Sequence, residues 1–194
     1  AVPLADRESW DVHFTLREMD LLVEIQAPYM QDQARFTYAD SARIEFRTPA
    51  GEIHSSLSAN RLTLDGAERI SMGGEVFITA VDNLEVLADT LIWERTGKQL
   101  HLPGAVRILT ASGTEEGHNL QTDIDLTQWS IEKTTGRWQG RRENQVYEVE
   151  IRARRAVSLY QEGYLVVHYD TVTVVHQSTT IHSPKARFDE NAGA

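Results

Sequence analysis

The sequence predicts an all-β protein made of short antiparallel strands, and three observations favour this class. Apolar and polar residues alternate in most segments of the chain, which is the pattern of half-buried strands. Tight-turn sequences separate the alternating runs, at spacings of mostly 10 to 16 residues, as in sandwiches, barrels and β-solenoids. No window of 11 or more residues shows helical spacing more clearly than alternation. We therefore expect strands and turns almost throughout.

The first predicted element is a β-hairpin. Apolar residues occupy every second position from Trp10 to Leu16 and again from Leu21 to Ala27, with Arg17–Asp20 between them. Further alternating runs follow at 70–78, 84–88, 100–108 and 164–168. Turn chemistry lies between runs at Asp65-Gly66, Asp82-Asn83, Thr96-Gly97, Ser112-Gly113 and Gln161-Glu162-Gly163.

A repeat of about one strand pair is visible along the chain. An apolar residue, any residue and then a small residue recur, and the small residues are separated by 32, 29, 34, 31 and 30 positions. Such a repeat is typical of stacked strand pairs that together bury one continuous interior. The small residues are Ala27, Ala59, Ala88, Thr122, Ala153 and Ser183.

Length and composition restrict the class of function. The 194 residues suit one all-β domain or one domain with an appendage, and the longest apolar runs considered, such as Leu165–Val167, are far shorter than a membrane helix. A net charge of −10 disfavours nucleic acid as a partner. The absence of cysteine excludes disulfides, thiolate metal sites and thiol catalysis.

Catalytic motifs are absent, so we expect a protein that is not an enzyme and needs no cofactor or metal. The chain has no GxSxG, HExxH, P-loop or GxGxxG sequence. Two pairs at strand spacing, His168 with Asp170 and Asp123 with Asp125, suit acid–base or metal chemistry. We favour the simpler interpretation, in which these are polar residues on solvated strand faces.

An arginine cluster at 137–155 has two interpretations. It could bind phosphate or carboxylate groups, or Arg152 and Arg154 could form a solvated strand face that pairs with Glu148 and Glu150, which we favour. The six residues are Arg137, Arg141, Arg142, Arg152, Arg154 and Arg155.

The predicted interior mixes bulky branched residues such as Val76 and Ile108 with small ones such as Gly74 and Gly104. A closed core uses this mixture to interdigitate. An apolar groove for acyl chains uses it as well, because small residues leave room between apolar walls. The residues alone leave both alternatives open.

Several segments resemble the LptC-like periplasmic proteins of lipopolysaccharide export, in the OstA-like jelly-roll superfamily. The resemblance covers about 8–138. The segments that carry it are 55–66 (SSLSANRLTLDG), 70–78 (ISMGGEVFI), 84–93 (LEVLADTLIW), 106–108 (VRI) and 113–123 (GTEEGHNLQTD).

The resemblance implies a V-shaped, open β-jelly roll. Such a protein would accept lipopolysaccharide from an inner-membrane ABC transporter and pass it along an apolar groove to a periplasmic OstA-like bridge protein. It would be periplasmic, and an N-terminal segment absent from this chain would anchor it to the inner membrane. Gly74 and Gly117 match glycines of the family pattern, and the resemblance places partner docking there. The groove would be lined by Met72, Val76, Ile78, Val86, Val106, Ile108, Leu120, Val149 and Ile151.

The chain departs from the family pattern after Trp138. We interpret 139–145 as a linker or long loop, because it is polar and lacks alternation. Residues 146–190 then supply additional OstA-like strands that continue the same sheet. In that case the exposed edge would move to Thr179–Phe188, where Pro184 would interrupt pairing.

Two other functions remain as alternatives. A carbohydrate-binding or adhesive β-sandwich would need a row of exposed aromatic side chains, which Trp93, Trp129 and Trp138 could supply. An enzyme on a jelly-roll barrel would need a histidine-rich metal cluster, whereas the seven histidines are scattered.

Overall fold

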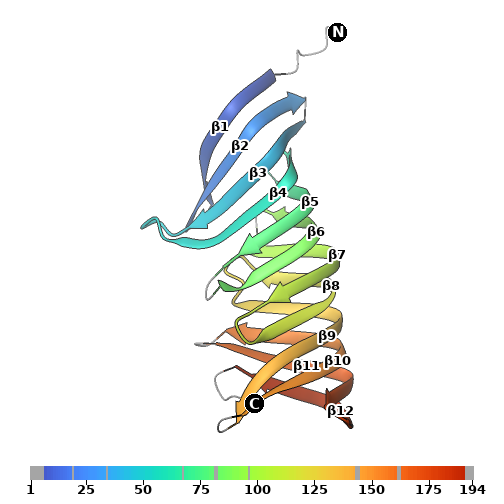
Figure 1. Ribbon diagram of the computed structural model, residues 1–194. Helices are drawn as coiled ribbons and strands as arrows, with labels where there is room; N and C mark the ends of the chain where they lie inside the picture. The colour runs from blue at the N-terminus through green and yellow to red at the C-terminus, as the bar shows by residue number, and fades with distance from the viewer. Residues whose placement is uncertain are drawn as a thin grey trace.

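The computed structural model is one antiparallel sheet of twelve strands, each hydrogen-bonded to its neighbours in sequence. It describes residues 7–18, 20–33, 35–66, 68–80, 83–95, 97–142, 145–160 and 163–190. The strands succeed one another along a long axis, from β1 at one end to β12 at the other (Figure 1). None of the residues described forms a helix long and apolar enough to cross a membrane.

The predicted all-β class is confirmed, and the expected turns lie between strands. The strands are β1 (Arg7–Glu18), β2 (Leu21–Gln33), β3 (Phe36–Arg47), β4 (Ile53–Asp65), β5 (Arg69–Thr79), β6 (Glu85–Glu94), β7 (Gln99–Leu109), β8 (Gly113–Asp123), β9 (Gln128–Arg142), β10 (Gln145–Tyr160), β11 (Tyr164–His176) and β12 (Thr179–Asp189). Four residues of the expected turns, 82, 96, 161 and 162, lie outside the description.

The predicted linker at 139–145 is wrong for the residues that can be placed. Gln139 to Arg142 form the end of β9 and pair with β10, so that Gly140 lies opposite Tyr147 and Gln139 opposite Glu148. The sequence pattern did not predict the end of β9 because its glycine and charged residues give no alternation of apolar and polar positions. Residues 143 and 144 lie outside the description. Strands β10 to β12 continue the same sheet, and β12 is its C-terminal edge.

A row of interruptions in strand pairing crosses the whole sheet, and we call it the bulge row. Each strand departs from regular pairing near its middle, next to the same departure in its neighbour. The row passes through Asp11, Pro28, Ser41, Asn60, Gly74–Glu75, Asp89, Gly104, Asn119, Lys133, Arg154, Asp170–Thr171 and Pro184. Many of these residues have positive φ, including Ser41 at 52°, Gly104 at 85° and Asn119 at 55°. Bulges of this kind bend a strand and increase its twist.

The bulge row divides the sheet into two walls whose inner faces pack on each other. Of the described residues, the first wall contains 12–18, 20–27, 42–59, 76–80, 83–88, 105–118, 134–142, 145–153 and 172–183. The second wall contains 29–33, 35–40, 61–66, 68–73, 91–95, 97–102, 120–131, 155–160, 163–169 and 185–190. Phe46 of the first wall meets Trp93 of the second edge to face, with ring centroids 4.8 Å apart. Nearer the C-terminus Trp138 stacks on Phe188 at 4.7 Å. The buried side chains of both walls form one continuous hydrophobic core.

Candidate functional site

The nine residues predicted to line a groove lie on the inner face of the sheet. Eight of them are buried and belong to the core, and Val149 is partly buried against it. They come from β5, β6, β7, β8 and β10. Val76, Ile78 and Ile108 have no exposed surface at all. The two walls are thus in contact along these strands, and the interior is a packed one.

The inner face becomes accessible at the C-terminal end of the sheet. A cavity of about 1080 Å³ is lined by Val149, Ile151, Val174 and Phe188, with His176 and Arg187 at its polar side. On β12, Ile181 lies directly opposite Val174 and is 56% exposed. This end of the apolar interior is therefore open to solvent.

The edge opposite the bulge row is closed by polar contacts between the two walls, which we call the seam. Lys98 Nζ lies 2.6 Å from Asp20 Oδ1, and Arg95 Nε donates to Glu18 Oε1 at 2.8 Å. His54 Nδ1 lies 3.1 Å from Asp125 Oδ1, and next to it Ser55 Oγ donates to the carbonyl of Ile124 at 2.6 Å. Ser112 donates to Glu190 near the C-terminus.

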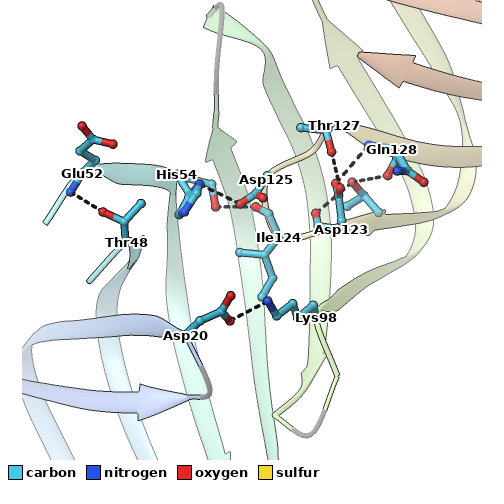
Figure 2. Close-up of polar contacts among 12 residues, drawn as sticks. Asp20, Thr48, Glu52, His54, Lys98, Asp123, Ile124, Asp125, Thr127 and Gln128 are labelled. Carbon is cyan, nitrogen blue, oxygen red and sulfur yellow. Dashed lines mark hydrogen bonds and ion pairs between the residues drawn. The ribbon is translucent and has the colours of Figure 1, made fainter. Parts of the chain in front are cut away.

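The seam contacts follow one geometrical rule. Each joins a residue of the first wall to one of the second wall that lies 69 to 78 positions further along the chain. The offset results from the twist of the sheet, which brings each hairpin end of one wall against a later hairpin end of the other. Figure 2 shows this arrangement at Asp20 and Lys98 and at His54 and Asp125.

Electrostatics differ along the seam. The hydrogen bond from Lys98 lowers the pKa of Asp20. Burial raises the pKa of Asp125, and the attraction of His54 only partly opposes this. Ion pairs with exposed partners stabilise a protein little, because water screens them, and Lys98 and Asp20 are 48% and 69% exposed. The Asp20–Lys98 contact is therefore weak, whereas Arg95 and Glu18 are largely buried and the contact of Ser55 with Ile124 is buried.

A stronger polar contact joins the walls inside the core. His168 of β11 places Nε2 3.1 Å from both carboxylate oxygens of Glu115 on β8, and both side chains are fully buried. Glu115 also accepts hydrogen bonds from Thr134 and from Trp138 Nε1, the latter at 3.1 Å. The cluster connects the two walls close to the accessible C-terminal end.

The two pairs considered for acid–base or metal chemistry do not form, and the solvated strand face that we favoured for His168 is wrong, because its side chain is buried. Asp123 accepts hydrogen bonds from Thr127 and from the backbone of Gln128, whereas Asp125 turns toward His54 (Figure 2). His168 is buried and Asp170 is exposed, because the bulge at Asp170 and Thr171 changes the direction of the chain. Among the residues described, no three His, Asp or Glu side chains are placed to hold a metal ion.

The arginine cluster is largely a surface network. Arg137 Nε lies 3.3 Å from Glu150 Oε2, Arg152 binds the same carboxylate, and the hydrogen bond from Arg152 lowers the pKa of Glu150. The expected pairing of Arg152 with Glu150 is confirmed. Arg155 lies over the ring of Tyr169 at 5.4 Å. The side chains of residues 141 and 142 lie outside the description.

The three tryptophans considered for sugar binding are core residues. Trp93, Trp129 and Trp138 are 1%, 3% and 0% exposed, so they form no surface row. The most exposed tryptophan is Trp10, at 65%, which meets Tyr29 edge to face.

Gly74 and Gly117, expected at a docking surface, lie on the internal strands β5 and β8. Gly74 has φ of +73° and forms part of the bulge row. Gly117 is buried, and a Cβ atom there would lie 2.6 Å from the carbonyl oxygen of Glu132 and 2.9 Å from Ile131. Its position accounts for a glycine through close packing of β8 on β9.

We expect Gly117→Ala to destabilise the protein by about 1–3 kcal/mol, because the β9 backbone must move to admit the methyl group. Gly73→Ala is the matched control, since the nearest atom to its Cβ would be 3.9 Å away. Thermal or urea unfolding of both variants measures the difference. Equal stability of the two variants would contradict the packing role.

Sequence reasoning did not find the seam or the Glu115–His168 contact. It considered Asp125 and His168 for chemistry, but paired each with an aspartate two positions away, Asp123 and Asp170. The true partners lie more than 50 positions apart, and no local spacing rule connects them.

Comparison with known proteins assigns no family. No protein-family model matches the chain, and no curated protein is significantly similar to it.

Proposed function

We propose that this protein is a lipid-transfer scaffold whose sheet is an open, V-shaped β-jelly roll. It accepts lipopolysaccharide, or a closely similar amphipathic lipid, from an inner-membrane ABC transporter and passes it to a periplasmic OstA-like bridge protein. The observation that carries the proposal is the single apolar inner face that runs through consecutive strands and opens at the C-terminal end. The segments that resemble LptC-like proteins support the same assignment.

The geometry favours entry of acyl chains between the two walls. Interior residues such as Ile78 and Ile108 are fully buried, so a lipid reaches them only when the walls separate. The bulge row acts as the hinge, and the edge that opens is the seam, which includes two solvent-exposed ion pairs. The sugar head of the lipid stays in water at this edge.

Transfer to a partner uses the two edges of the sheet. Among the described residues, strands β1 and β12 each pair with one neighbouring strand, so their outer backbone groups can accept an added strand. Pro184 lies in β12 where pairing with β11 is interrupted. We therefore place partner docking at these edges and not at Gly74 and Gly117.

Site-specific photo-crosslinking tests the proposed groove. We expect a photoreactive residue at Val149, on the accessible inner face, to form adducts with lipopolysaccharide. A second probe at Ile108 samples the deeper interior. The control is Arg152, three residues from Val149, whose side chain is 63% exposed on the outer face. Adducts at Arg152 and none at Val149 or Ile108 would overturn the proposal.

A further inference from the structure

Three buried polar side-chain atoms without a hydrogen-bond partner belong to residues on adjacent strands. Within the described part of the chain, five buried side-chain nitrogen or oxygen atoms have no hydrogen-bond partner. Two of them, the Nε atoms of Arg47 and Arg69, lie 3.1 and 3.3 Å from glutamate oxygens in ion pairs. The other three are Trp129 Nε1, Ser158 Oγ and His168 Nδ1.

These three residues are neighbours on the inner face of the second wall. Ser158 of β10 lies directly opposite Trp129 of β9, and opposite Val166 of β11 on its other side. His168 is two positions from Val166 and shares its face. The three side chains are 3%, 2% and 0% exposed for Trp129, Ser158 and His168. An unpaired polar group at such depth destabilises the fold, so three on neighbouring strands call for an explanation.

The hydrogen-bonding capacity of the cluster specifies what would complete it. Glu115 only accepts hydrogen bonds, so His168 Nε2 carries a proton toward it. His168 Nδ1 accepts a hydrogen bond in the neutral imidazole and donates one in the imidazolium, whereas Trp129 Nε1 is a donor only and Ser158 can donate or accept. A ligand hydroxyl satisfies this set in either case, because it accepts from Trp129 or Ser158 and can also donate to His168 Nδ1 or accept from it.

The surroundings of the cluster are apolar. Ile131, Ala156 and Val166 on the same strands are buried members of the core. The complementary ligand is therefore an acyl chain with a hydroxyl group attached, and not a free sugar or an ion.

We propose that Trp129, Ser158 and His168 form a hydroxyl-binding site within the lipid groove, which selects hydroxylated acyl chains over unsubstituted ones. This inference rests on the proposed lipid-binding function and specifies the lipid class. Because the three polar atoms are unpaired in the free protein, they weaken its stability in favour of ligand recognition.

Fatty-acid binding to the whole chain tests the site. The probes are stearic acid and its 3-hydroxy and 12-hydroxy derivatives, measured by competition with a fluorescent fatty acid. We expect at least one hydroxylated acid to bind about three- to ten-fold more tightly than stearic acid, as one or two net hydrogen bonds provide. Trp129→Phe with Ser158→Ala should abolish this preference. Val166→Ala is the control, since it should weaken all three acids equally and keep the preference.

Each outcome separates the two proposals. If no fatty acid binds, the lipid-transfer function fails. If all acids bind equally to the unmodified protein, or if the preference survives in the double variant, lipid binding stands and the hydroxyl site is wrong. Unfolding provides an independent measurement: Ser158→Ala should be at least as stable as the parent, because it removes an unpaired buried hydroxyl. A clear loss of stability would show that Ser158 serves the fold.

Discussion

Cross-linking the two walls at the seam is expected to abolish lipid loading. The double variant His54→Cys, Asp125→Cys places thiols where the native atoms lie 3.1 Å apart on opposite walls. A short bismaleimide then joins the walls covalently, and since the chain has no native cysteine, only the introduced thiols react. A lipid that must enter between the walls loses access, and we expect loading to fall by at least about ten-fold as the open state is depleted. Retention of fluorescent lipid before and after cross-linking measures the effect.

The matched control joins two cysteines within one wall. Ser56 of β4 lies directly opposite Thr79 of β5, so cross-linking Ser56→Cys with Thr79→Cys ties neighbouring strands without closing the groove. We expect this protein and both unmodified double variants to load lipid normally. Equal loading of the seam-linked and control proteins would show that lipid enters by another route, such as the cavity at the C-terminal end.

The bulge row explains which strands the sequence could predict. In β5 and β7 the buried, inward-facing residues are even-numbered on both sides of the bulge row, as from Met72 to Val76 and from Leu102 to Val106. The sequences of these two strands therefore alternate without a break. In β4 the buried positions shift from Ala59 to Leu62. One added residue at the bulge thus moves the buried positions from odd-numbered to even-numbered residues. For this reason the sequence pattern did not predict β3, β4 and β9 as continuous strands.

The bulge row also explains the repeat of small residues along the chain. Ala27, Ala59, Ala88, Ala153 and Ser183 each directly precede a row position, where the strand bends and bulky side chains would crowd the hinge. Thr122 does not, because β8 bends at Asn119. Local patterns therefore predicted the all-β class, several of the strands and much of the inner face. The seam and the Glu115–His168 contact depend on how far the sheet twists before its walls meet, which no local pattern contains.

Replacing His168 by leucine is expected to have the largest effect on stability of any single substitution considered. Glu115 would lose its partner on the opposite wall while remaining fully buried, and removal of one member of a buried pair costs about 3–5 kcal/mol because the remaining charge is uncompensated. Urea unfolding measures the loss. Adding the second substitution, Glu115→Gln, should restore part of the lost stability. It removes the unpaired buried carboxylate and leaves an amide oxygen that can still accept hydrogen bonds from Thr134 and Trp138.

The adjacent residue provides the control for this prediction. Glu116 also belongs to β8, but its partner Arg107 lies 3.3 Å away on the outer face, and both side chains are about half exposed. Arg107→Leu should cost no more than about 1 kcal/mol, because water already screens the pair. If His168→Leu were equally mild, the two walls would be held together by apolar packing alone, and Glu115 would be adequately stabilised by donors of its own wall. A large difference would instead show that the buried Glu115–His168 contact, and not apolar packing alone, holds the two walls together.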